Sequence, residues 1–363
     1  MYLVRPSAIE IDAWASLMES EDKDAAMKWS WDQFYPAMKK SETFTPPRDD
    51  VAQIGNISWS AATHGTSGPM QASYPAFMLA QVGGWAPSLE AMGLPPLKEP
   101  NGGRTLGSLV GPSWINPSNW TRSYSKAAYL DPAISRPNLH VLVNAMATRL
   151  IFADGPGNLN ATGVEFAGSA DAPRKTVNVK TEVILAGGVV GSPQLLMLSG
   201  VGPKDVLEAA GVAVKVELPG VGQHVQDHLT APVVWTSTRE TAGDIQQSGS
   251  DFSKTPEFLS FVNSATAFTN ITRLFGTDGA AGFQKFIADG RDESARTLVP
   301  SQYPEVVEGY KAIYDTIANK ILTSEVAVIE LLLATNTPGQ IGVQAALQHP
   351  LRYVTSIFLT LGI

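Results

Sequence analysis

The sequence predicts a protein of the α/β class that is α+β in its overall organisation, and three patterns lead to this prediction. Residues 182–202 read as a buried strand, a glycine-rich turn and a helix, in that order. Residues 136–168 alternate apolar and polar side chains in two runs, as the strands of a hairpin do. Towards the C-terminus, a helical pattern at 301–322 precedes a strand pattern at 324–335. Helices and strands are therefore mixed along the chain.

The composition is that of a folded protein and excludes several classes of function. The chain has 363 residues, of which 44% are hydrophobic and 17% charged, so it can bury a sizeable core as one large domain or two smaller ones. Its formal net charge of -8 would repel a polyanion, which argues against nucleic-acid binding. No apolar run reaches the roughly 18 residues that a membrane-spanning helix needs. The absence of cysteine excludes disulfides, thiolate catalysis, iron–sulfur clusters and cysteine-type zinc sites.

The cellular location is left open by the sequence. The first residues carry no basic region followed by an apolar stretch, so no signal peptide is visible. If the protein is extracellular, its signal peptide lies upstream of this chain. Four Asn-x-Ser/Thr sequons favour secretion weakly, at Asn56, Asn119, Asn160 and Asn270.

Outside the three leading patterns, the chain shows weaker local signals. A short helix is predicted to begin near Ala8, and the proline pair at 46–47 ends any helix before it. Residues 56–120 are rich in Gly, Pro, Ser and Trp, which favours a functional surface or lid over core. A further helix closed by Pro132 is predicted at 125–134. Residues 236–300 read as irregular and polar.

The strongest local signal is the strand, turn and helix unit. The segment 175–188 predicts two strands, and the second includes the apolar run 183–185, which is typical of a parallel strand buried on both faces. Gly187-Gly188 allows a tight turn, Ser192-Pro193 suits the start of a helix, and Gly200 suits a left-handed C-cap. Such a unit places a helix N-terminus at a cofactor. By itself it is also compatible with glycines that serve packing alone.

The same region carries a resemblance to a known family. The runs GSPQLLMLSGVGP (191–203) and LPGVGQHVQDH (218–228) closely resemble the second signature of the glucose–methanol–choline (GMC) oxidoreductases. The resemblance covers nearly the whole chain, to about Pro350. Further matching segments are MYLVRP at 1–6 (with Leu3 where the family usually has an aromatic residue), Lys40-Ser41-Glu42, His64-Gly65 with Gly68-Pro69, Arg136-Pro137-Asn138-Leu139 and QAALQHP at 344–350.

The resemblance implies a two-domain flavoprotein of fungal type that is truncated at both ends in this chain. Residues 1–230 would form a partial Rossmann-like FAD-binding domain without its first βαβ unit. Residues 231–350 would begin a substrate-binding domain with a largely antiparallel sheet. The segment 351–363 departs from the family and is treated as an atypical tail.

The cofactor implied by the resemblance is FAD, and three residues are carried over as cofactor-binding positions. Ala147 occupies the position whose main chain meets the adenine in relatives, where valine is usual. Ala186 and Gly187 fall beside the ADP half of the cofactor. Val189 and His224 depart from the family signature, and neither forbids flavin binding.

The family's remaining machinery is not found in these residues. No G-x-G-x-x-G fingerprint occurs, and Gly220 and Gly222 supply only two of its glycines, after a loop. The family's catalytic histidine belongs to a segment far beyond residue 350. The implied chemistry is transfer of a hydride from the CH–OH group of an alcohol to FAD, here in an incomplete chain. The alternatives are a non-catalytic remnant or splice product, and a member that uses FAD only as structure.

No catalytic residue and no metal site is predicted. Asp227 and His228 are interpreted as a loop-fixing pair, and no set of His, Asp and Glu has metal-ligand spacing. The expected partner is a small-molecule alcohol, with no nucleic acid and no membrane, and the oligomeric state is left open. None of the five histidines is assigned as the base: His64, His140, His224, His228 and His349.

Overall fold

The computed structural model describes residues 3–19, 22–98, 100–153, 159–223, 225–299, 301 and 303–348. Residues 154–158, between the two strands of the predicted hairpin, lie outside the described residues, as do His224, His349 and the tail 351–363. The chain forms two compact units. Unit 1 comprises Met1–Ser135, His228–Asp292 and Ala312–Ile363, and unit 2 comprises Arg136–Asp227 and Glu293–Lys311. Each unit is described by itself.

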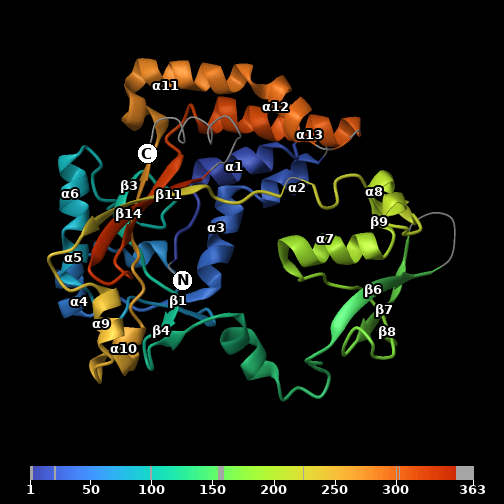
Figure 1. Ribbon diagram of the computed structural model, residues 1–363, viewed down its shortest axis with the longest axis horizontal. Coiled ribbons are helices and arrows are strands. Elements are labelled where there is room, and N and C mark those ends of the chain that lie inside the picture. The colour runs from blue at the N-terminus through green and yellow to red at the C-terminus, as the bar shows by residue number, and fades with distance from the viewer. Residues whose placement is uncertain are drawn as a thin grey trace. The chain divides into compact units, whose positions relative to one another are not determined.

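Unit 1 is built on a five-stranded antiparallel sheet in the order β11-β14-β13-β12-β3. Strands β3, β11 and β14 of this sheet are labelled in Figure 1. An antiparallel sheet was implied for residues 231–350, and this sheet is antiparallel, but it also includes β3 from before residue 231. The strand predicted at 324–335 is present as β13, with a later start. The strands are β3 (Gly107–Val110), β11 (Thr230–Thr236), β12 (Ala265–Thr269), β13 (Ile329–Ala334) and β14 (Gln340–Leu347).

One face of this sheet is covered by the main hydrophobic core. Alternate side chains of β12 point to opposite faces, so Ala265 and Ala267 enter the core while Thr266 and Phe268 lie on the other face. Trp85 packs into this core and donates its indole N–H to the Thr266 carbonyl at 2.9 Å. The helices over this region are α4 (Asp49–Gly55), α5 (Ala80–Gly83), α6 (Trp85–Ala91), α9 (Ala242–Ser248) and α10 (Pro256–Leu259).

The segment 56–120 corrects one sequence-based expectation. It is loop-rich, as its composition indicates, yet it is not a lid over the core. Tyr74, Val82, Trp85 and Leu89 come from this segment and are among the buried residues of the main cluster. Large apolar side chains contribute about 1.5–3 kcal/mol each when buried, which outweighs the loop propensity of their neighbours. Its short elements are 3-10 turn Ala61–Thr63, β2 (Met70–Ala72) and β4 (Ile115–Asn116); β2 pairs in parallel with β1 (Glu42–Phe44), and β4 pairs antiparallel with β5 (Thr121–Arg122).

The predicted helix near Ala8 is confirmed as α1 (Ala8–Ser16). Ser7 caps it through a capping box, in which the Ser7 hydroxyl accepts from Glu10 N–H and the Glu10 carboxylate accepts from Ser7 N–H. Two further helices follow, α2 (Lys23–Lys28) and α3 (Trp31–Lys40). The helix at 125–134 forms as a π-helical turn, Lys126–Leu130, and a 3-10 turn, Asp131–Ala133.

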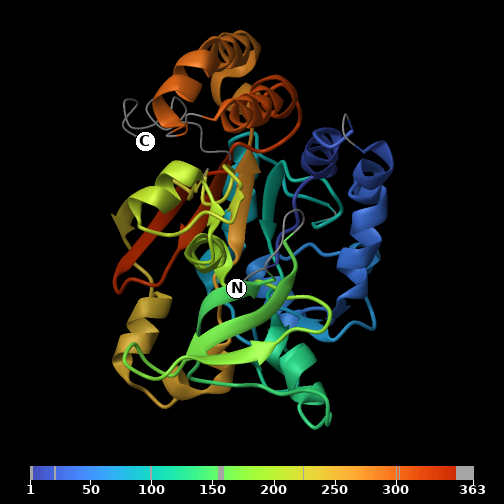
Figure 2. The same ribbon diagram turned by 90° about the vertical axis from the view of Figure 1, so that its right-hand side faces the viewer.

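The prediction that residues 236–300 are irregular was wrong. Besides α9, α10 and β12, this stretch contains the 3-10 turn Phe252–Lys254, the long helix α11 (Ile271–Asp289) and α12 (Arg291–Leu298). Gly276 has a φ of 70° inside α11 and breaks its helical geometry, which weakens the periodic signal. The helix at 301–322 is confirmed as α13 (Pro304–Thr316) and the π-helical turn Ile317–Ile321. Figure 1 and Figure 2 both place α11 beyond one end of the sheet.

Unit 2 contains a three-stranded antiparallel sheet in the order β6-β7-β8. The predicted hairpin is confirmed by the pairing of β6 with β7, but residues 136–145 form no strand and β6 starts only at Met146. A parallel pair, β9 with β10, lies in the same unit. The elements are β6 (Met146–Phe152), β7 (Ala161–Ala167), β8 (Lys175–Asn178), α7 (Gly188–Leu198), β9 (Val201–Gly202), α8 (Lys204–Ala209) and β10 (Val216–Glu217).

The strand predicted at 183–185 is not formed. Ile184 is 81% exposed, and no strand among the described residues pairs with this segment. A parallel strand needs hydrogen-bonded neighbours to satisfy its backbone, so apolar composition alone does not create one. Helix α7 also begins earlier than predicted, at Gly188, and Ser192 accepts the Gly187 N–H from inside the helix at 2.9 Å. Gly200 is confirmed in the left-handed region, with a φ of 87°.

Candidate functional site

The three predicted cofactor-binding residues all lie in unit 2 and are all exposed. Ala147 is on β6, opposite Phe166 of β7, while Ala186 and Gly187 form the approach to α7. Helix α7 packs against β6, and the Ser199 hydroxyl at its end accepts the Leu150 N–H of β6 at 2.8 Å. The structure therefore brings together the two elements that carry these residues.

The start of α7 suits the phosphates of a dinucleotide. The first N–H groups of a helix have no partner within the helix, and their dipoles favour a negative charge. Gly188 has a φ of 79°, and a Cβ added at Gly188 or Gly191 would meet no atom within 4 Å. The backbone is thus approachable from outside, without side chains in the way. The start of α7 therefore leaves room for a phosphate-bearing ligand at Gly188 and Gly191.

A second candidate site lies in unit 1, on the sheet face opposite the main core. This sheet-face pocket has a volume of about 220 Å³. It combines apolar and polar groups, as binding sites for small molecules usually do. Its lining includes Val4, Glu10, Thr105, Phe268, Glu330 and Gln348.

Glu330 provides a hydrogen-bond acceptor in this pocket. It belongs to the central strand β13 and stands between Phe268 and Ala346 of the neighbouring strands. Its carboxylate accepts hydrogen bonds from the Thr266 hydroxyl at 3.1 Å and from the Gln348 amide at 3.0 Å. A carboxylate on a central strand is stabilised only when such donors compensate its desolvation. The pocket therefore presents a fixed acceptor group that suits a hydroxyl-bearing ligand.

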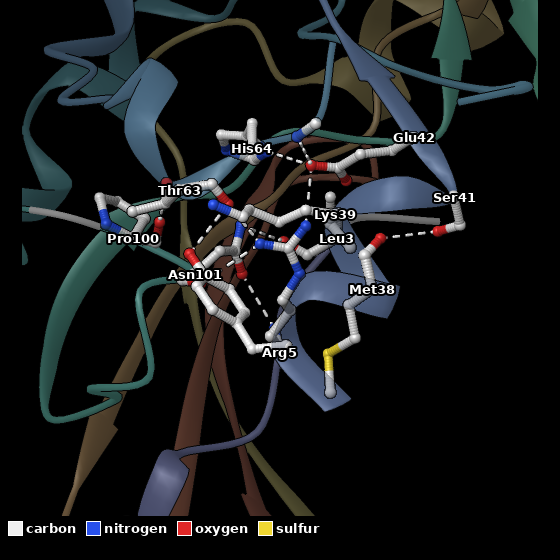
Figure 3. Close-up of polar contacts among 12 residues, drawn as sticks. Leu3, Arg5, Met38, Lys39, Ser41, Glu42, Thr63, His64, Pro100 and Asn101 are labelled. Carbon is white, nitrogen blue, oxygen red and sulfur yellow. Dashed lines mark hydrogen bonds and ion pairs between the residues drawn. The ribbon is translucent and has the colours of Figure 1, made fainter. Parts of the chain in front are cut away.

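One wall of the sheet-face pocket is anchored by a buried polar cluster, the Arg5–Glu42–His64 cluster (Figure 3). Glu42 is fully buried, and its Oε1 accepts from Arg5 Nη2 at 2.7 Å and from His64 Nδ1 at 2.9 Å. The Gly65 N–H donates to the same oxygen at 2.8 Å. The His64 ring also stacks on Phe44, with the ring centroids 3.9 Å apart. A single carboxylate oxygen thus joins three separate chain segments.

Electrostatics favour the ionised form of Glu42. Burial by itself raises the pKa of Glu42, but the hydrogen bonds from His64 and Gly65 and the charge of Arg5 outweigh it and leave the pKa below its ordinary value. Glu42 Oε2 has no hydrogen-bond partner in the described part of the chain. The stabilisation therefore rests on donors that converge on Oε1.

Arg5 links this cluster to the pocket wall. Its guanidinium donates to the carbonyls of Thr63 and Asn101 as well as to Glu42. The Asn101 side chain accepts the Arg5 N–H at 2.9 Å and donates to the Leu3 carbonyl at 3.3 Å. Asn101 itself has a φ of 68°, which asparagine tolerates better than most residues. Because residues 4–6 line the sheet-face pocket, the cluster fixes the position of that wall.

Sequence reasoning missed the role of His64. It found His64-Gly65 and Ser41-Glu42 as separate family motifs, without a carboxylate partner for the histidine. Gly65 is the signal that links them, because a Cβ there would lie 1.8 Å from the Lys39 carbonyl oxygen. Only glycine permits this close approach between the two segments. The contact between these two motifs therefore becomes visible only in the fold.

The other described histidines have less prominent surroundings. His228 Nδ1 is 2.6 Å from the Leu347 carbonyl oxygen, which agrees with the loop-fixing role expected for this residue. His140 is exposed. Among the described residues, no three His, Asp or Glu side chains gather as the ligands of a metal ion would. No described helix is both long and apolar enough to cross a bilayer.

Comparison with known proteins relates this geometry to a family. The family model described as GMC oxidoreductase matches residues 1–230. Over 357 residues the chain is 36% identical to the GMC oxidoreductase family protein Mala s 12 of Malassezia sympodialis, a match that covers 97% of this chain and 54% of that protein. It is 38% identical over 236 residues to dehydrogenase xptC of Emericella nidulans, covering 65% of this chain and 36% of that protein.

Solved structures give the same result. The fold is similar to that of a FAD-dependent oxidoreductase from Chaetomium thermophilum, with a TM-score of 0.81 and 27% identity. It is equally similar to a fungal aryl-alcohol oxidase, with a TM-score of 0.81 and 28% identity. Each match covers 97% of this chain and 60% of the other.

These matches define the class of the fold as that of flavin-dependent oxidoreductases. The chain belongs to the GMC oxidoreductase family. It spans about half the length of the curated relatives that it matches.

Proposed function

We propose that the protein is a FAD-dependent oxidoreductase that acts on CH–OH groups of small-molecule alcohols, of which this chain contributes the elements described above. The main observation in support of this proposal is the open glycine turn at the start of α7, in a chain that belongs to the GMC oxidoreductase family. The first N–H groups of a helix can bind the phosphates of FAD, and the space at Gly188 and Gly191 is open to such a ligand.

Three residues would lie against the cofactor, and one of them, Ala147, would do so through its main chain. Ala147 on β6 would meet the adenine, and Ala186 and Gly187 would lie along the ADP portion. Bound FAD supplies the hydride acceptor. Residues 1–230 would form the FAD-binding domain and residues 231–350 part of the substrate-binding domain. We assign no catalytic base within this chain.

The sheet-face pocket is the proposed binding site of the alcohol. Its volume of about 220 Å³ suits a small molecule, and Glu330 and Gln348 offer polar contacts at one side of it. The apolar side is supplied by Val4 and Phe268. These residues would bind and orient the hydroxyl-bearing carbon and keep water away from it.

The visible absorption spectrum of the purified chain, after removal of free FAD, tests this proposal. A retained flavin band is expected, and Gly191→Val should abolish it because the new side chain occupies the open surface at the start of α7. The matched control is Gly309→Val, since Gly309 also lies in unit 2 on a helix with open space around it. A folded but colourless parent protein would instead favour the alternative of a non-catalytic remnant.

A further inference from the structure

The extended segment at 104–106 separates two hollows in unit 1. Thr105 lines the sheet-face pocket, whereas its neighbours Arg104 and Leu106 line a second hollow of about 450 Å³. Successive side chains of an extended chain point to opposite sides, so one thin wall serves both hollows. We call the second hollow the basic pocket, and its lining includes Leu97, Lys98, Arg104, Leu106, Arg273 and Glu325.

The basic pocket carries a charge opposite to that of the whole chain. Three cationic side chains, Lys98, Arg104 and Arg273, line it together with one carboxylate, Glu325. The pocket therefore has a formal charge of about +2, while the chain has a net charge of -8. Such a local reversal of sign concentrates anions at the site and repels cations.

The cations retain capacity to bind a ligand. Arg104 pairs with Glu325 at 3.1 Å, and Arg273 donates one N–H through Nη1 to the Gly93 carbonyl. Lys98 has no hydrogen-bond or ion-pair partner among the described residues. The Lys98 ammonium and the other guanidinium N–H groups of Arg273 are thus available to an anionic group, which guanidinium binds well because its donors form a planar fork.

The wall beside these charges is apolar. Leu97 and Leu106 pack against a buried cluster formed by Leu109, Phe268 and Ala327. A ligand with an apolar body can therefore bury surface against the leucines while its charged group meets the cations. By contrast, the sheet-face pocket on the other side of the wall carries the carboxylates Glu10 and Glu330.

We propose that the basic pocket is a binding site for an organic anion, a carboxylate or phosphate group attached to an apolar body. The sheet-face pocket, lined by Glu10 and Glu330 together with Arg5, lacks this excess of positive charge and offers the Glu330 carboxylate to a hydroxyl-bearing ligand. The two hollows therefore select ligands of different charge across one wall. This inference does not depend on flavin binding.

The test uses the full chain at low ionic strength and measures the affinity of 2-naphthoate by isothermal titration calorimetry. Saturable binding at one site is expected, and the neutral analogue 2-naphthamide, which has no hydroxyl group, should bind much more weakly. Removing one full charge at roughly 4 Å in a water-like medium weakens binding by about five-fold, so Lys98→Gln and Arg273→Gln should each have this effect. Raising the salt to 1 M should weaken 2-naphthoate binding in the parent, because exposed charges are then screened.

Arg48→Gln is the matched control, since Arg48 is an exposed arginine of unit 1 outside the basic pocket. It should leave the affinity unchanged. Equal binding of the neutral analogue, or equal weakening by Arg48→Gln, would overturn the proposal. Because the substituted side chains are exposed, circular dichroism should show parental folding in each variant. Comparison with 2-naphthyl phosphate then shows which of the two head groups the site prefers.

Discussion

The two units of the molecule differ in how completely they cover their own apolar and polar groups. Unit 1 covers one face of its sheet with helices, and it compensates a buried carboxylate through donors that converge on Glu42 Oε1. Unit 2 leaves many large apolar side chains exposed on and near β6 and α7. Examples are Leu142, Val143, Met146, Ile184, Val189 and Val190, each more than 60% exposed.

Unit 1 is therefore organised around its own core, whereas unit 2 exposes an apolar surface that a ligand or another part of a protein could cover. Monomeric proteins rarely expose many large apolar groups close together unless the surface is used for binding. In unit 2 that surface includes the segment before α7, where the predicted FAD-contacting residues lie. Stability in unit 1 should therefore depend on single buried groups, whereas stability in unit 2 should depend more on a bound ligand.

The largest effect is expected from breaking the buried cluster with Glu42→Gln. This change keeps the shape of the side chain but leaves the buried Arg5 guanidinium, 5% exposed as a residue, without its counter-charge. Loss of one partner of a buried ion pair costs about 3–5 kcal/mol. Urea unfolding followed by tryptophan fluorescence measures the change in the free energy of unfolding.

The control for this substitution is Asp50→Asn, which breaks the exposed pair between Arg48 and Asp50. An exposed pair and a carboxylate in the first turn of α4 each contribute at most about 1 kcal/mol, so the loss should be well below that of Glu42→Gln. Equal effects of the two substitutions would contradict the structural importance assigned to the cluster, and with it the contrast between the units.

The second largest effect is expected in how the free energy of unfolding depends on pH. The pKa of Glu42 lies below its ordinary value of 4.5 in the folded protein. Its ionised form therefore stabilises the fold above pH 4.5, and this contribution disappears as the pH falls through the lower folded pKa.

Unfolding curves between pH 6 and pH 3 measure this contribution, if run in parallel on the parent and on Glu42→Gln. The difference between the two proteins should shrink as the pH falls, because both then carry a neutral group at position 42. A difference that stays constant over this range would show that the carboxylate charge is not the source of the stability.

A smaller effect should distinguish two glycines within unit 2. Gly200 has a φ of 87°, and a Cβ there would lie 2.5 Å from the Ala213 carbonyl oxygen. Gly211 has a φ of 69°, but a Cβ there would meet no atom within 4 Å. Gly200→Ala should cost about 2 kcal/mol through backbone strain and the clash, and Gly211→Ala about 1 kcal/mol through strain alone.

Thermal unfolding of the two alanine variants measures this ranking. The comparison isolates the close contact from the left-handed backbone, since both positions share the second feature. An equal loss at Gly200 and Gly211 would mean that the packing between the end of α7 and the segment at Ala213 does not hold in solution.

Local periodicity was enough to predict the elements that depend on their own sequence. The strand at β13, the hairpin of β6 and β7, the helix at α1 and the C-cap at Gly200 follow from residue patterns within a few positions. Helix α11 was missed because its glycines and polar residues, with the break at Gly276, hide the helical period. An element was therefore predicted where its sequence pattern is local and regular, and missed where that pattern is interrupted.

The buried cluster could not be predicted from patterns, because its members come from distant segments. Arg5 and Glu42 are 37 residues apart, and Glu42 and His64 are 22 apart, at no periodic spacing. The prediction of a strand at 183–185 was wrong for a different reason. Its apolar composition suits a buried strand, but burial depends on neighbours that composition does not specify.

The smallest expected effect tests that segment directly. Ile184→Ser should change the free energy of unfolding by no more than about 0.5 kcal/mol, because the side chain is 81% exposed. In a buried strand the same change would remove most of the 1.5–3 kcal/mol that such a side chain contributes. Hydrogen exchange provides a second readout, since backbone amides at 183–185 should exchange faster than those of the fully buried strand β12. Adding FAD should slow exchange at the start of α7, where the ligand would cover the backbone, more than in β12, which is already fully buried. Slow exchange at 183–185 without FAD would mean that this segment has strand partners in solution, and the contrast between the two units would then be smaller than the structure indicates.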